Sequence, residues 1–366
     1  MVEATAQTAD QPARAGCEHI AASDADLDAH LVAVLATPPG RADPYPHYEH
    51  IRERAPIFRS TIGSWVVSRY GDCQQVLRSP RFGKMSDRQD VARMRMARWG
   101  MSEQEVTDLL EFFDGRQSML TLNPPDHTRL RGLVARAFTP NTVEAMRPHV
   151  AVLCDELLDT MEEHAQTGAV DIMRELAFPL PVAVIGELLG VPAADRAEFQ
   201  GLVRAATVVL EPMATVEDLH SARASRITMD RYFRELIAER RHEPRADSLS
   251  ELIAVSDGSD RLTEDEVVTT AILLFAAGFE TTTNLIGNGL LALLRHPDQL
   301  AVLRASTENA TALQRAVDEL LRWDSPVQLD SRIALGPTES GGPAHRSGRK
   351  CHDAHWGCQS RPAPLF

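Results

Sequence analysis

Ala277-Gly278-Phe279-Glu280-Thr281-Thr282 places a carboxylic acid and two hydroxyl groups inside a long apolar stretch of the chain. The apolar residues around this stretch follow a helical period over residues 263–296. Thr263 and Glu266 have the spacing of a capping box, and Pro297 ends the pattern. Since about 30 residues at 1.5 Å each give a helix of roughly 45 Å, we expect it to run through the middle of a mainly α-helical domain.

The polar turn of this helix has two interpretations. Burying Glu280 costs several kcal/mol unless something uses or satisfies the carboxylate. Gly278 weakens a helix by about 1 kcal/mol relative to alanine, but it lets another group approach the backbone closely. The turn is therefore either a functional site or a core helix with a polar kink, in which Thr281 bonds back to a carbonyl of the preceding turn.

A second helix is predicted over residues 126–137, after two prolines and with Asp126 as its N-cap. His127 and Arg131 are four residues apart and share one face of it. Two hydrogen-bond donors at this spacing suit a carboxylate or a phosphate. An ordinary exposed polar face is the alternative, because Arg129 is basic too.

A third helix is predicted over residues 313–323, where Glu319 and Arg322 are three residues apart and can pair on one face. Alone, this spacing equally fits a solvated surface pair.

The N-terminal part of the chain has a different pattern. Residues 1–26 are rich in Ala, Asp and Gln and are predicted to be a flexible tail. A short amphipathic helix that Asp43-Pro44-Tyr45-Pro46 opens and that ends at Ala55, a strand over 65–68 and a helix over 73–77 follow. The pattern from there on is helical, so we expect one mostly α domain with a small β region.

Composition limits the class of function. With 52 acidic and 38 basic residues the formal net charge is -14, which argues against a nucleic-acid partner. Residues 271–279, the longest apolar stretch, are too few to span a bilayer, and residues 1–30 contain no signal-peptide pattern. The five cysteines are scattered and odd in number, so no disulfide framework is expected. We expect a cytoplasmic protein that binds neither membrane nor nucleic acid.

In this order the motifs resemble the soluble bacterial branch of the cytochromes P-450, which are haem-thiolate monooxygenases. The resemblance covers about residues 43–342, and it implies a cytochrome P-450 fold. The stretches that carry it are Pro124-Pro125-Asp126-His127-Thr128-Arg129-Leu130-Arg131, Ala137-Phe138-Thr139-Pro140, Pro179-Leu180-Pro181, Glu187-Leu188-Leu189-Gly190-Val191-Pro192, Ala277 to Thr282, Glu319-Leu320-Leu321-Arg322 and Ser325-Pro326-Val327-Gln328.

The resemblance also implies roles for individual residues. His127, Arg131 and Arg332 are implied to hold the haem propionates, and cations suit this role because buried carboxylates need charged donors. Glu319 and Arg322 are implied to be structural, locking the core together with an arginine further along the chain.

On the long helix, Ala277 and Gly278 are implied to contact the cofactor. Glu280 and Thr281 are implied to be catalytic, delivering protons to the dioxygen activated at haem in a site that otherwise excludes water. The implied reaction inserts one oxygen atom from O2 into a small hydrophobic organic substrate. The implied electron source is NAD(P)H, through a ferredoxin reductase and a ferredoxin.

The chain departs from the family near its C-terminal end. The family's signature loop reads Phe-x-x-Gly-x-x-x-Cys-x-Gly and supplies the cysteine that binds the iron. Here Ser347 stands four residues before Cys351, and Ala354 stands four before Cys358, so neither fits. We therefore assign no residue as the axial ligand of the haem iron. Without a thiolate ligand, the iron lacks the electron donation that favours cleavage of the O–O bond.

We expect residues 343–366 to be an aberrant tail that a frameshift between about residues 338 and 348 created. Basic residues and prolines dominate this tail, and no period of 2 or 3.6 is visible. Codons that encode Gln359-Ser360-Arg361-Pro362 can also encode Asn-Arg-Asp-Pro when the reading frame is shifted by one base. The cytochromes P-450 have this string at the corresponding point of their sequences. The P-450 domain then covers residues 27–342 and is C-terminally incomplete, and the chain as written is expected to be inactive.

Two alternatives remain open. One is a non-catalytic remnant or binding protein without haem iron ligation. The other is a zinc site made of Cys351, His352, His355 and Cys358, whose ligand types suit zinc although their spacing matches no known finger.

Because the cysteine loop is missing, the 366-residue chain, reduced under carbon monoxide, is expected to show no thiolate-ligated haem spectrum. Absorbance spectroscopy of the purified chain measures this. A normal thiolate Soret band would contradict the expectation and make Cys351 or Cys358 the ligand.

Overall fold

A computed structural model describes residues 25–61, 64–84, 101–114, 116–208, 214–257 and 260–335, together with the backbone of residues 352–356. The described chain is mainly α-helical and divides into two compact units. Unit 1 consists of Met1–Phe82 and Leu329–Ser360, and unit 2 of Gly83–Gln328 and Arg361–Phe366. In the described ranges, no helix combines the length and the hydropathy that crossing a membrane requires.

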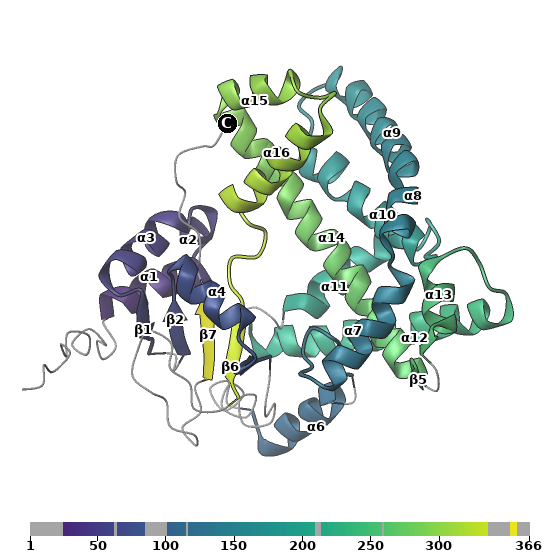
Figure 1. Ribbon diagram of the computed structural model, residues 1–366, viewed down its shortest axis with the longest axis horizontal. Helices are drawn as coiled ribbons and strands as arrows, with labels where there is room; N and C mark the ends of the chain where they lie inside the picture. The colour runs from purple at the N-terminus through teal and green to yellow at the C-terminus, as the bar shows by residue number, and fades with distance from the viewer. Residues whose placement is uncertain are drawn as a thin grey trace, which may run out of the picture. The chain divides into compact units, whose positions relative to one another are not determined.

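Unit 1 combines short helices with a mixed sheet of strand order β1-β2-β7-β6-β3 (Figure 1). Its apolar core includes Leu27, Ile51 and Phe58. The elements are α1 (Ala25–Ala36), α2 (Pro38–Ala42), α3 (Tyr45–Arg54), α4 (Tyr70–Arg78), β1 (Ile57–Arg59), β2 (Ser64–Val67), β6 (Ser331–Ala334) and β7 (His352–Trp356), with β3 (Phe82–Gly83) at the edge of the sheet.

The predicted elements of this unit are present, with shifted ends. The predicted strand is β2, and the helices predicted over residues 43–55 and 73–77 are α3 and α4. The bound of the predicted tail at residue 26 was wrong, because α1 begins at Ala25, and the rest of that prediction lies outside the described residues. Acidic residues in the first turn of α1 favour a helix N-terminus there, and the fully buried Leu27 anchors it.

Residues 343–366, predicted to be an aberrant tail, contain one described regular element that their sequence did not predict. The backbone of β7 pairs in parallel with β2 and antiparallel with β6. A neighbouring strand offers unpaired N–H and C=O groups to any extended segment, whatever its side-chain pattern. Backbone pairing of this kind needs no period of 2.

Unit 2 is built almost entirely of helices. They are α6 (Glu103–Asp114), α7 (Asp126–Ala137), α8 (Pro140–Ala145), α9 (Arg147–Ala165), the π-helix η1 (Met173–Ala177), α10 (Pro179–Leu188), α11 (Arg196–Thr207), α12 (Val216–His242), α13 (Ser248–Ala254), α14 (Glu264–Arg295), α15 (Pro297–Arg304) and α16 (Ala310–Trp323), and a hairpin is formed by β4 (Ser256–Asp257) and β5 (Asp260–Arg261).

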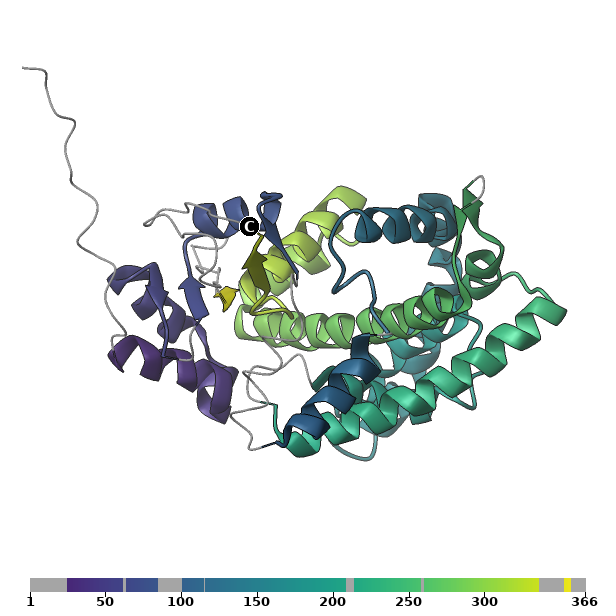
Figure 2. The ribbon, with the colours of Figure 1, turned by 90° about the horizontal axis from the view of Figure 1, so that it is seen from below.

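Helix α14 is the predicted long helix and has 32 residues. Its predicted capping box is present: Thr263 Oγ1 accepts from the Glu266 N–H at 3.2 Å, and Glu266 Oε2 accepts from the Thr263 N–H at 2.8 Å. Helix α12 runs alongside α14 (Figure 2). The N-terminal half of α14 is buried in the main core, in which Phe275 and Phe233 are fully buried.

The predicted helix over residues 126–137 is α7, with the predicted bounds. Asp126 as its N-cap was wrong: the cap position is occupied by Pro125, and no side chain caps the helix. Pro125 already has helical backbone angles, with φ -82° and ψ -22°, so the chain enters the helix one residue before the aspartate.

A buried ion pair fixes the segment between α12 and α13. Arg240 is 2% exposed, and it donates to Asp247 Oδ2 at 2.6 Å and to the Gly190 carbonyl at 2.8 Å. Gly190 has φ 68°, and a Cβ there would lie 2.2 Å from Asp247 Oδ2. The loop after α10 therefore needs glycine both for its backbone angle and for the space that the ion pair takes.

Replacing Arg240 with methionine is expected to lower the free energy of unfolding by about 3–5 kcal/mol, because it leaves the buried Asp247 carboxylate unpaired. Denaturant unfolding followed by far-UV circular dichroism measures the change. The matched control is Arg241→Met on the same helix, which removes an exposed pair with Glu264 and should change stability by at most about 1 kcal/mol. Equal losses from the two variants would contradict the assignment.

Candidate active site

The hydroxyl groups of the central polar turn bond to their own helix. Thr281 Oγ1 donates to the Ala277 carbonyl at 2.9 Å, and Thr282 Oγ1 donates to the Gly278 carbonyl at 3.1 Å. These are the bonds of the polar-kink interpretation. They do not exclude function, because a hydroxyl that donates one hydrogen bond keeps its lone pairs available to accept others.

Glu280 is half-buried in this turn. Its carboxylate has no hydrogen-bond or ion-pair partner among the residues that the structure describes. A carboxylate that loses part of its hydration without gaining a protein donor is unfavourable unless water or a ligand satisfies it. Glu280 is therefore available to a group outside the protein, as a proton-handling residue has to be.

Ala277 and Gly278 lie on different sides of α14. A Cβ at Gly278 would be 2.9 Å from Cγ1 of Ile185 on α10, so the group that approaches this glycine is a side chain of the core. Ala277 is exposed and shares a face with Thr281, one turn later. Of the two predicted cofactor contacts, Ala277 thus has the accessible position.

His127 and Arg131 occupy one face of α7, as predicted. His127 is half-buried and Arg131 exposed, and neither has a partner among the described residues. Arg129 behaves differently: it pairs with Asp260, at 3.1 Å, and with Glu266 in the first turn of α14. Sequence reasoning missed this link, although the acidic first turn of α14 was a visible signal for a cationic partner.

Arg332 belongs to unit 1, and the other predicted propionate ligands belong to unit 2. Its guanidinium donates to Asp330 Oδ2 at 2.5 Å and to the Ser331 carbonyl at 2.8 Å. Its charge is therefore already compensated within its own strand and the residue before it.

Glu319 and Arg322 form the pair that their spacing predicted. Arg322 Nε donates to Glu319 Oε2 at 2.6 Å, and Nη2 donates to the other carboxylate oxygen. The Glu319 side chain is only 12% exposed, so this is no ordinary solvated surface pair. The hydrogen bond that Arg322 donates to Glu319 raises the pKa of Arg322.

Comparison with known proteins decides the family. The sequence profile described as Cytochrome P450 matches residues 100–342. The chain belongs to the cytochrome P450 family. It is 39% identical over 307 residues to the cytochrome P450 monooxygenase PikC of Streptomyces venezuelae, covering 82% of this chain and 68% of that protein. It is 38% identical over 289 residues to the vitamin D(3) 25-hydroxylase of Pseudonocardia autotrophica, covering 78% and 65%.

Solved P450 structures confirm the mainly α fold. The structure of P450BioI in complex with a hexadec-9Z-enoic acid ligated acyl carrier protein has a TM-score of 0.74 and 31% identity, covering 87% of this chain and 77% of that one. Mycobacterium smegmatis CYP164A2 in its ligand-free state has a TM-score of 0.71 and 36% identity, over 90% and 78%. The chain spans about two thirds to three quarters of the length of the curated relatives it matches.

P450 membership implies haem, and the described residues fit one part of this group. His127 and Arg131 are hydrogen-bond donors on one face of α7 that have no partner among the described residues, so they suit the propionates. The described cysteines do not suit the iron: the Cys73 thiol is buried and donates to the Val67 carbonyl, and burial raises the pKa of Cys154. An iron ligand needs the opposite, a stabilised thiolate.

The remaining cysteines, Cys17, Cys351 and Cys358, lie outside the described residues, as do the side chains of His352 and His355. The alternative zinc site that Cys351, His352, His355 and Cys358 were predicted to form therefore stays a prediction.

Proposed function

We propose that the intact gene of this P450 encodes a haem-dependent monooxygenase that inserts one oxygen atom from O2 into a small hydrophobic organic substrate. The observation that carries this proposal is the Glu280-Thr281 turn, which places a carboxylate without a protein partner beside a hydroxyl in the middle of the longest helix. Haem, when bound, supplies the dioxygen activation. Family membership at 35–39% identity to several bacterial P450s supports the same reaction class.

The proton is handled by two side chains of α14. Thr281 Oγ1 donates to the Ala277 carbonyl, which fixes the direction of its hydrogen and leaves its lone pairs to accept a hydrogen bond. Glu280 is half-buried and within reach of solvent, so in this proposal its carboxylate takes a proton from water and passes it on toward the hydrogen bond that Thr281 accepts.

His127 and Arg131 hold the propionates in this proposal, because they are hydrogen-bond donors on one face of α7 with no carboxylate partner among the described residues. The family also implies a propionate contact for Arg332, which would have to give up its pair with Asp330. Ala277 offers the accessible small side chain against the cofactor, while Gly278 serves helix packing against Ile185. Glu319 and Arg322 keep their structural role on α16.

The redox partners are inferred from the family: a ferredoxin and an NAD(P)H-dependent ferredoxin reductase, in the cytoplasm. The relatives are named for different chemistry, a vitamin D(3) hydroxylation in one and biotin biosynthesis in another. The variety of these named reactions supports a small organic substrate for this chain, but it does not identify which compound that is.

The second candidate function is a haem-free remnant or binding protein. It is favoured by one observation: neither described cysteine has the surroundings of an iron ligand. A frameshift after about residue 338 reconciles this observation with the first candidate, and it is supported by the end of the family match at residue 342.

In the frame-restored protein, Thr281→Ala is expected to leave substrate binding intact and to divert at least half of the electrons to hydrogen peroxide, because the variant loses the ordered proton supply. Product formed and peroxide released per NAD(P)H consumed measure this. The matched control is Thr282→Ala, which removes the neighbouring hydroxyl that bonds to the Gly278 carbonyl and should keep coupling unchanged. Unaltered coupling in Thr281→Ala would count against the proposed role.

A further inference from the structure

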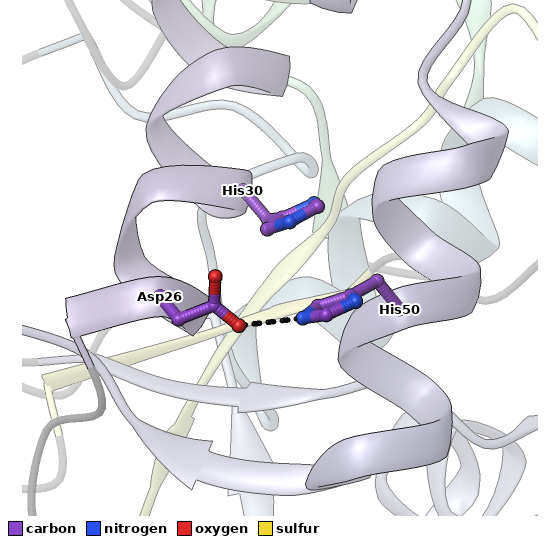
Figure 3. Close-up of side chains that lie close together, drawn as sticks. All are labelled: Asp26, His30 and His50. Atoms are coloured by element: carbon purple, nitrogen blue, oxygen red, sulfur yellow. Dashed lines mark hydrogen bonds and ion pairs between the residues drawn. The ribbon is translucent and has the colours of Figure 1, made fainter.

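Unit 1 gathers histidines and an aspartate where α1 meets α3 (Figure 3). Asp26 and His30 are one turn apart on α1, and His50 reaches toward them from α3. One candidate ligand atom from each of these residues lies within 4.8 Å of those from the other two. Two helices therefore bring together one carboxylate and two imidazoles, which are side chains of the kinds that bind zinc and similar divalent metals.

The two helices hold these groups at a fixed separation. Leu27 and Leu31 of α1 pack in one core cluster with Ile51 of α3, and all three are at most 2% exposed. Asp28 of α1 accepts two hydrogen bonds from the Thr61 N–H, at 3.0 and 3.1 Å. Ligands on packed helices lose little freedom when they bind, so such a site is preorganised.

The distances are close to those of a coordination shell. His50 Nε2 lies 2.7 Å from Asp26 Oδ2, and the His30 and His50 rings stack with centroids 4.0 Å apart. Zinc bonds of about 2.0–2.1 Å put neighbouring tetrahedral ligand atoms roughly 3.3 Å apart. To bind one ion, the two stacked imidazole rings have to turn so that one nitrogen of each points to the same place, and the metal replaces the proton that Asp26 and His50 share.

His47 gives this cluster an outer partner. Its Nδ1 lies 2.9 Å from Nδ1 of His30, so the two imidazoles share a hydrogen bond. When the Nδ1 of His30 is engaged in this way, its Nε2 remains for a metal. Metal-binding histidines commonly have such a partner on the second nitrogen, which fixes the ring and its tautomer.

The carboxylate of Asp26 is the anionic group of the cluster. The opposing charge is Arg54, whose Nη1 lies 3.9 Å from Asp26 Oδ2 and is exposed.

We propose that Asp26, His30 and His50 form a binding site for one divalent metal of the zinc type, with His47 as the outer partner of His30. The Asp26 side chain is 48% exposed and that of His50 is 36% exposed, so an ion and a completing water ligand can enter from solvent. The site joins α1 to α3 within unit 1, and it is separate from the haem site proposed above.

Zinc and cobalt(II) titrations of the full chain test this proposal, with Cys351→Ser and Cys358→Ser in every protein so that the C-terminal thiols cannot bind. One equivalent of zinc is expected to bind, and cobalt(II) is expected to give visible d–d bands. His30→Gln and His50→Gln should each weaken zinc binding at least about 10-fold. Far-UV circular dichroism checks that the variants keep their helices.

The matched control is His164→Gln, because His164 forms a single histidine–carboxylate pair with Glu175, at 2.8 Å, without a second imidazole. It should bind zinc like its parent. Arg54→Gln should bind about 2- to 3-fold more tightly, because it removes the opposing charge, and a gain cannot arise from misfolding. The proposal is overturned if the parent protein shows no saturable zinc binding. It is also overturned if His30→Gln and His50→Gln leave one-equivalent zinc binding unchanged.

Discussion

The burial of α14 is the constraint on which the rest of unit 2 depends. A 32-residue helix with an apolar N-terminal half cannot stand alone in water, so other helices have to cover it. Helices α10 and α12 pack along it, and Gly278 lets Ile185 of α10 come close to its backbone. The same packing fixes the direction of the Glu280-Thr281 turn, which therefore has a defined position before any cofactor binds.

Two ion pairs of unit 2, those of Arg129 and Arg240, contribute differently to its stability. Arg129 ties the start of α7 to the first turn of α14, through partly exposed groups that water screens. Arg240 is almost fully buried, and its loss leaves a buried charge behind. The stability of unit 2 therefore depends more on the Arg240 pair, although the Arg129 pair lies nearer to the proposed haem contacts.

The sequence was sufficient to predict elements with local signals. The capping box at Thr263, the prolines before α7 and the helical spacing of Glu319 and Arg322 each act within a few residues, and all three helices were predicted nearly to their ends. Only the cap of α7 was wrong, because Pro125 takes helical backbone angles itself.

Long-range contacts could not be predicted in this way. The bond between Arg240 and the Gly190 carbonyl joins residues 50 positions apart, and β7 pairs through its backbone without a side-chain pattern. The Thr281 bond was foreseen as one interpretation because it is local, whereas the Asp26–His50 contact joins residues 24 positions apart and was missed. The Arg332–Asp330 pair was missed although it is local, because an acidic and a basic residue two positions apart at the start of a strand give no distinctive motif.

The central claim is that this chain belongs to the P450 family, and we propose that restoring the reading frame covers helix faces that are exposed here. On α16, Leu313, Val317 and Leu321 lie one turn apart and are 38%, 44% and 42% exposed. Hydrophobic-dye fluorescence of the 366-residue chain, compared with the frame-restored protein with haem, tests this most directly. The account predicts that the 366-residue chain binds the dye strongly, that Val317→Glu reduces this binding, and that the frame-restored protein binds little dye. Equal and weak dye binding by both would contradict it.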